Sequence, residues 1–188
     1  MRVIAGRFHG LNLLPVKGRN TRPTSAKVKE AMFNILTPYF RNSMCGCDLF
    51  AGTGALGIEA VSRGVQRMYL VDSNRQAQQV IRQNVDKTHA QTDFRIWSMT
   101  AQRALIQLQK EHVKLDLLLL DPPYAQHTTQ KLIEQARQAS ILNQQALIMI
   151  ETDYHLSLPP ERLYQVLADK TYGQTYIQVW RFIGSREN

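Results

Sequence analysis

The sequence predicts an α/β domain with a doubly wound, mostly parallel sheet, a terminal antiparallel hairpin and a small N-terminal β/α extension. From about residue 45, short apolar segments alternate with segments of helical periodicity, as in successive βαβ units. The apolar run at 117–120 would face the core on both sides of a strand, which is typical of a parallel sheet covered by helices. The last two strand-like segments leave room only for a turn between them, which indicates an antiparallel hairpin.

The elements follow in a regular order along the chain. Two short strands are expected at 3–5 and 11–14, and a polar loop from 17 to 25 follows them. Thr24 or Ser25 can cap the next helix, whose apolar face includes Val28 and Met32. Sheet strands are expected at 45–50, 68–71, 93–97, 115–120 and 147–150, helices at 55–63, 74–88, 101–110 and 128–139, and hairpin strands at 163–167 and 176–183.

The composition excludes several classes of protein. The 188 residues, of which 44% are hydrophobic and 20% charged, can bury a full core and do not match a disordered chain. No apolar run is long enough to cross a bilayer and no signal-peptide pattern follows Met1, so we expect a cytoplasmic protein without a membrane partner. Cys45 and Cys47 lack a second ligand cluster and the five histidines share no metal-ligand spacing, so no metal is expected.

The positive charge is concentrated near the N-terminus. Residues 1–41 hold eight Lys or Arg against Glu30 alone, a net charge of +7, while the whole chain carries +8. Clustered basic side chains gain affinity for polyanions by releasing counterions from phosphates. The segment therefore indicates a nucleic-acid partner, with a merely solvated surface as the alternative.

A glycine-rich loop follows the first expected sheet strand and opens a helix. Gly52, Gly54 and Gly57 fit the pattern G-x-G-x-x-G, and Asp72 stands 20 residues after Gly52 at the end of the next strand. The glycines permit a tight turn and close approach of a ligand, and the acid can bind ribose hydroxyls. This pattern predicts a nucleoside-containing cofactor.

Asp48, at the mouth of the same strand, bears on the choice of cofactor. A carboxylate there would repel the pyrophosphate of NAD, whereas S-adenosylmethionine brings an ammonium, a sulfonium and no phosphate. Asp48 therefore favours S-adenosylmethionine, although a role in ordering the loop through backbone N–H groups is compatible with this.

The segment Asp121-Pro122-Pro123-Tyr124 directly follows the apolar strand at 115–120. Loops at the carboxyl ends of parallel strands line the ligand crevice, so Asp121 is expected beside the glycine-rich loop. The two prolines stiffen the turn and leave carbonyl groups as acceptors. An exocyclic amine could donate its hydrogens to the Asp121 carboxylate and the Pro122 carbonyl, with Tyr124 stacked on the base. These three residues are the predicted catalytic set.

At these residues the chain resembles the class I S-adenosylmethionine-dependent methyltransferases, which have a Rossmann-like fold. DLFAGTG at 48–54 is similar to their first motif, and DPPY at 121–124 to that of amino-group methylases. VIAGR at 3–7, RPTS at 22–25, KEAMFNIL at 29–36 and KTYG at 170–173 resemble signatures of the bacterial RsmD family. That family methylates the N2 amine of one guanine in 16S ribosomal RNA.

The resemblance implies a role for individual residues. Cofactor contacts are implied for Asp48, Ala51, Gly52, Thr53, Gly54 and Ser73, with Asp72 on the ribose. Thr100 and Ala101 would hold the adenine, and the Thr100 hydroxyl is a weaker acceptor than the Asp found there in many relatives. Arg22, Pro23 and Thr24 would lie at the mouth of the cleft, and Arg2, Arg7, Lys17 and Arg19 would contact RNA phosphates.

The implied organisation is a basic RNA-binding extension, 1–41, packed on a methyltransferase domain, 42–188. The expected partner is 16S rRNA in the small ribosomal subunit or its assembly intermediate, and the chain is expected to be a monomer. Three other functions stay open at this point. They are adenine-N6 methylation of DNA or RNA, because DPPY also serves adenine amines, an NAD-dependent oxidoreductase, and a non-catalytic RNA-binding module.

Overall fold

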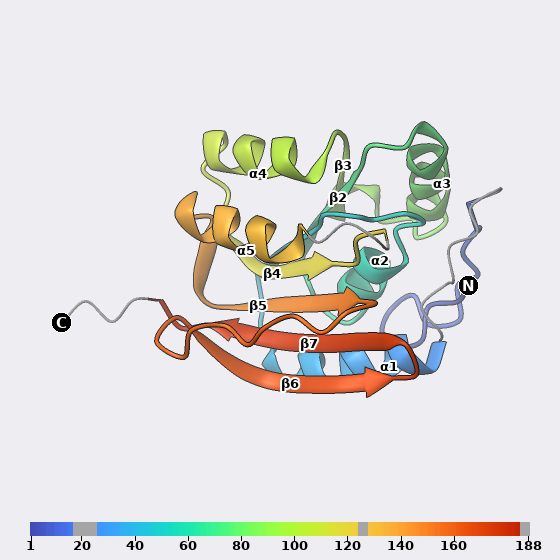
Figure 1. The fold of residues 1–188 in the computed structure, drawn as a ribbon. Coiled ribbons are helices and arrows are strands. Elements are labelled where there is room, and N and C mark those ends of the chain that lie inside the picture. The colour runs from blue at the N-terminus through green and yellow to red at the C-terminus, as the bar shows by residue number, and fades with distance from the viewer. Residues whose placement is uncertain (17–25, 124–127, 185–188) are drawn as a thin grey trace.

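A computed structural model describes residues 1–16, 26–123 and 128–184, and Figure 1 shows their arrangement. A seven-stranded sheet lies between two layers of helices, in the strand order β3-β2-β1-β4-β5-β7-β6. Strands β1 to β5 run parallel to one another, and β7 is antiparallel to both β5 and β6. The predicted fold class, a mostly parallel sheet that ends in an antiparallel hairpin, is confirmed.

Most elements lie close to their expected positions, but the hairpin strand expected at 163–167 extends to Tyr172. The strands are β1 (Cys45–Asp48), β2 (Arg67–Asp72), β3 (Phe94–Ser98), β4 (Leu115–Leu120), β5 (Leu142–Thr152), β6 (Tyr164–Tyr172) and β7 (Thr175–Phe182). The α-helices are α1 (Ala26–Leu36), α2 (Ala55–Ser62), α3 (Arg75–Asp86), α4 (Ala101–Lys110) and α5 (Thr129–Gln138). The described residues also form two 3-10 turns, η1 (Thr37–Tyr39) and η2 (Gln91–Asp93). Gly173, with φ of +64°, lies in the hairpin turn as expected.

Each face of the sheet has its own core. Helices α1, α2 and α3 bury one face around Met32, Ile58 and Ile81, and α4 and α5 bury the other around Leu105 and Ile133. Alternate residues of β4 belong to opposite cores, so the strand is buried on both sides as its unbroken apolar run predicts. Within the described residues, none of the helices is long and apolar enough to cross a membrane.

The two N-terminal strands expected at 3–5 and 11–14 are the main difference from the prediction. Only Arg2 and Asn12 form an antiparallel bridge, although the N–H of Val3 also donates to the carbonyl of Leu11. The reason is a tertiary contact, because the N–H groups of Ile4 and Ala5 donate to the carboxylate of Glu59 on α2 and not to a neighbouring strand. This prediction of two strands was wrong.

Candidate active site

The glycine-rich loop connects β1 to α2 at the carboxyl edge of the sheet. Gly52 and Gly54 have φ values of +56° and +80°, which side chains with a Cβ rarely adopt. A Cβ on Gly57 would lie 2.2 Å from Cδ2 of Leu70, so the third glycine allows α2 to pack closely on β2. Gly52 and Gly54 therefore allow the turn, and Gly57 allows the helix to pack on the sheet.

Asp72, the last residue of β2, holds this loop in place. Its carboxylate accepts hydrogen bonds from the N–H of Gly52 at 3.0 Å and from the N–H of Asn74 at 2.8 Å. The glycine loop and the expected ribose-binding acid are thus in direct contact. The adjacent Ser73 is exposed, which leaves its hydroxyl accessible at the same edge.

Asp48 is buried beneath the loop with its charge poorly compensated. Its side chain is 1% exposed, and Oδ1 accepts a hydrogen bond from the N–H of Phe50 at 3.3 Å. Oδ2 is buried without a hydrogen-bond partner among the residues that the structure describes. Burial, together with the negative charge of Asp72, raises the pKa of Asp48 to about 7, even though N–H groups of Phe50 and Gly57 oppose the shift. A bound cation would satisfy this carboxylate, and a phosphate would not.

Asp121 follows β4 at the same edge, between β1 and β5. Its side chain is half-buried, and Pro122 beside it is buried. Burial, with the carboxylates of Glu151 on β5 and Asp48 on β1, raises the pKa of Asp121 well above its usual range. Tyr124 lies outside the described residues. The edge thus brings acidic groups from three neighbouring strands close enough to influence one another.

Thr100 and Ala101 begin α4, next to the end of β3. The Thr100 side chain caps this helix, since its hydroxyl accepts from the N–H of Arg103 at 3.4 Å, and Ala101 is 5% exposed. Because Asp72 pairs with Ser98 in the β2–β3 register, this turn and the end of β2 share one edge. The structure therefore gathers the expected cofactor residues at a single end of the sheet.

Two buried amides that the sequence analysis missed support this edge. Gln78 of α3 donates to the carbonyl of Asp72 at 2.7 Å and accepts a hydrogen bond from the Ser98 hydroxyl. Asn84, also on α3, donates to the carbonyl of Thr53 at 2.9 Å. Both amides share the buried face of the helix with Ile81. This spacing within an apolar stripe was the signal that could have identified them.

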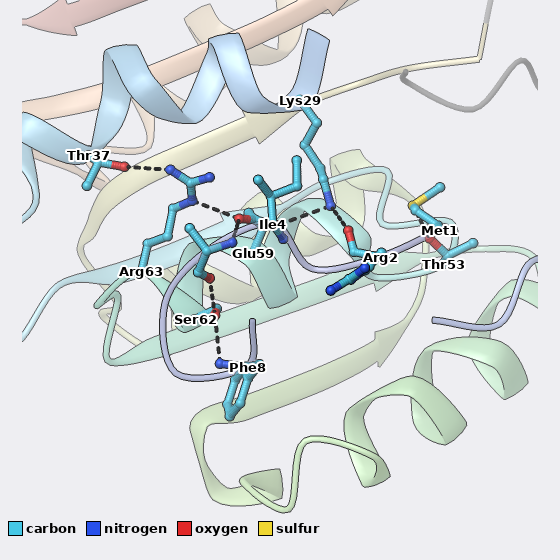
Figure 2. Close-up of polar contacts among 11 residues, drawn as sticks. Met1, Arg2, Ile4, Phe8, Lys29, Thr37, Thr53, Glu59, Ser62 and Arg63 are labelled. Carbon is cyan, nitrogen blue, oxygen red and sulfur yellow. Dashed lines mark hydrogen bonds and ion pairs between the residues drawn. The ribbon is translucent and has the colours of Figure 1, made fainter. Parts of the chain in front are cut away.

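The basic extension is partly neutralised by carboxylates of the sheet domain. Arg7 pairs with Asp93, and Arg41 pairs with Asp116. Figure 2 shows the buried cluster in which Lys29 contacts Glu59, with Nζ 3.1 Å from Oε2. These contacts reduce the electrostatic attraction that a count of N-terminal charges implies. The residues Lys17, Arg19, Arg22, Pro23 and Thr24 lie outside the described part of the chain.

Metal binding and attack by a cysteine thiol are two other kinds of chemistry that a site can carry. No group of three or more His, Cys, Asp or Glu side chains among the described residues could hold a metal ion. Cys47 is buried within β1, and burial raises its pKa well above the usual value. The pKa of Cys45 is raised to about 11, again mainly by burial, so neither thiol is activated as a nucleophile.

The strand order and the glycine loop between β1 and α2 give the chain the fold of a class I methyltransferase. Residues 1–181 match the family described as "Conserved hypothetical protein 95". The chain therefore belongs to this family, the RsmD-like methyltransferases.

Individual relatives agree with this assignment. The chain is 36% identical to the Bacillus subtilis protein named "Putative rRNA methyltransferase YlbH", covering 96% of this chain and 98% of that one. It is 30% identical to the Escherichia coli protein named "Ribosomal RNA small subunit methyltransferase D", covering 85% and 78%. A solved structure titled "Putative methyltransferase yhhF from Escherichia coli" superposes with a TM-score of 0.86 at 27% identity, covering 98% and 99%.

Proposed function

We propose that this chain transfers a methyl group from S-adenosylmethionine to the exocyclic N2 amine of a specific guanine in 16S ribosomal RNA. The observation that carries the proposal is the position of Asp121, half-buried beside the glycine loop at the carboxyl edge of the sheet. A carboxylate there can hold an amine while the loop holds a cofactor. The names of the relatives, which include rRNA and small-subunit methyltransferases, support an RNA substrate.

The residues around the glycine loop fit S-adenosylmethionine, which supplies an electrophilic methyl group on a positively charged sulfur. Asp48 offers a buried carboxylate oxygen without a partner in the described structure, which suits a cationic group. Asp72 and the turn at Gly52 would hold the ribose and the amino-acid part, and Ala101 would lie under the adenine. A dinucleotide fits less well, since its pyrophosphate would approach the Asp48 carboxylate.

Asp121 has two tasks in this mechanism. Its carboxylate accepts a hydrogen bond from the target amine, and the Pro122 carbonyl accepts the second, so that the nitrogen lone pair is oriented for attack. The methylated nitrogen must then lose one proton. The raised pKa of Asp121 makes its carboxylate a stronger base for that proton than an exposed aspartate.

Residues 1–41 are proposed to bind the RNA, and residues 42–188 to carry the reaction. Arg2 and Arg7 are exposed at the surface, and each can add a phosphate contact. Binding through Arg7 would compete with its ion pair to Asp93. We further propose a cytoplasmic monomer that acts on the small ribosomal subunit or its assembly intermediate, and sedimentation of the purified chain tests the monomer.

The variant Asp121→Asn tests this assignment, with Glu161→Gln as the control because Glu161 is an exposed carboxylate. The substrate is small ribosomal subunits from cells that lack the protein, and the cofactor carries a labelled methyl group. We expect Asp121→Asn to lower methyl transfer about 100-fold or more. Calorimetry should show that it still binds S-adenosylhomocysteine. Wild-type turnover in Asp121→Asn would refute the catalytic role.

A further inference from the structure

Asn84 connects two segments that the proposed function assigns to different ligands. Its side chain is fully buried on α3, where Oδ1 accepts from the N–H of Leu14 at 2.7 Å. Nδ2 donates to the carbonyl of Leu14 at 3.1 Å and to the carbonyl of Thr53 at 2.9 Å. One side chain therefore holds the N-terminal segment, residues 1–16, against the glycine loop.

These three hydrogen bonds fix the orientation of the Asn84 amide. Both N–H donors point to carbonyls and the oxygen faces an N–H, so a flipped amide would set its oxygen against the carbonyls of Leu14 and Thr53. Asparagine is a poor helix former, and burial adds the cost of removing a polar group from water. A leucine on this face of α3 would pack well but could not satisfy any of the three backbone groups.

A second set of contacts fixes the same segment to the helix that the glycine loop opens. The N–H groups of Ile4 and Ala5 donate to Glu59 of α2 at 2.8 and 3.1 Å, and Lys29 donates to the carbonyl of Arg2 at 2.8 Å. Figure 2 shows this cluster around the segment, with Met1 beside Thr53 of the glycine loop. The segment that carries Arg2 is therefore fixed to α2, the helix that follows the glycine loop, and it contacts the loop itself where Met1 meets Thr53.

We propose that Asn84 is a positioning residue that couples RNA binding to cofactor binding. The inference rests on the proposed function, in which the N-terminal segment contacts RNA and the glycine loop contacts S-adenosylmethionine. Because Leu14 and Thr53 share the Asn84 amide, a shift of Leu14 on RNA binding would be transmitted through Asn84 to the carbonyl of Thr53, and a shift of Thr53 on cofactor binding would be transmitted to Leu14. Coupling between two sites typically changes affinity about 5- to 150-fold, and it is equal in both directions.

The experiment compares Asn84→Asp and Asn84→Ala with the matched control Lys87→Met. Aspartate keeps an acceptor for the N–H of Leu14 but loses both donors, and alanine loses all three contacts without adding a buried charge. Lys87, at the C-terminal end of the same helix, donates to the carbonyl of Asn12 at 3.0 Å, so it joins α3 to the same segment through a solvent-exposed hydrogen bond. Cooperative thermal unfolding shows that each variant is folded.

The readout is the dissociation constant of S-adenosylhomocysteine, measured by calorimetry with and without a saturating 16S rRNA transcript. We expect RNA to tighten binding about 5-fold or more in the wild type and in Lys87→Met. In a folded Asn84 variant, the dissociation constants measured with and without RNA should be nearly equal, so that their ratio is close to one. The same ratio in a folded Asn84 variant as in the wild type, or no coupling in the wild type, would overturn the inference. If the wild type binds no S-adenosylhomocysteine at all, the proposed function itself fails.

Discussion

Replacing Asp48 with asparagine removes a buried charge at the glycine loop while keeping the shape of the side chain. Asp48 is 1% exposed and one of its oxygens has no hydrogen-bond partner among the described residues. The asparagine oxygen can still accept from the N–H of Phe50, as Oδ1 does now. The substitution therefore removes the negative charge and keeps the hydrogen bond from Phe50.

The pKa of Asp48 determines the size and the sign of the change in folding stability with pH. Burial raises the pKa from 3.8 to about 7 in the folded protein, so between these values the folded chain keeps a proton that the unfolded chain has released. Stability of the ligand-free protein therefore falls as pH rises from about 4 to about 7, and the loss is complete above that range. Three pKa units at 1.36 kcal/mol each give about 4 kcal/mol.

Asp48→Asn should regain most of that free energy at pH 8 and much less at pH 4. For a chain of this length, about 4 kcal/mol raises the melting temperature by roughly 10 °C. Thermal unfolding of the ligand-free protein at both pH values measures the gain, and Asp153→Asn, which changes an exposed aspartate, is the control. An equal melting temperature for wild type and Asp48→Asn at pH 8 would refute this account of the charge.

Two further substitutions on α2 test its close packing on β2 and its buried ion pair with Lys29. Gly57→Ala would bring a Cβ to 2.2 Å from Leu70, so we expect a loss of about 1–3 kcal/mol in urea unfolding, and an unchanged midpoint would contradict the close packing. Glu59→Gln would leave the buried Lys29 without its counter-charge and should cost about 3–5 kcal/mol. Glu134→Gln, which breaks a surface ion pair, should cost less than about 1 kcal/mol, and equal losses would show that burial is unimportant.

The sheet could be predicted because the apolar runs and helical periodicities that indicate its elements lie within short segments of the chain. Strand β4 has the bounds expected from its apolar run, and α4 begins and ends where its periodicity does. Strand β5 starts at Leu142, five residues earlier than expected, because polar residues such as Gln144 interrupt its apolar pattern. The prediction of the first two strands was wrong for a different reason. The N–H groups of Ile4 and Ala5 donate to Glu59, which is more than 50 residues away in the sequence.

The site was predictable where a motif spans consecutive residues. The glycine loop and the turn after β4 put Asp48 and Asp121 at one edge, because parallel strands bring their carboxyl ends together. Asn84 and Gln78 were missed, since a polar residue in an amphipathic helix is usually on its exposed face. The burial of Lys29 was also missed, because its partner Glu59 is distant in sequence.

The identity of the methylated nucleoside tests the central claim most directly. Small ribosomal subunits from cells lacking the protein would be incubated with the chain and methyl-labelled S-adenosylmethionine, and the RNA would be digested to nucleosides. We expect label in N2-methylguanosine at a single position of 16S rRNA. Label in N6-methyladenosine would contradict the guanine assignment, and the absence of any label despite binding of S-adenosylhomocysteine would contradict the small subunit as substrate.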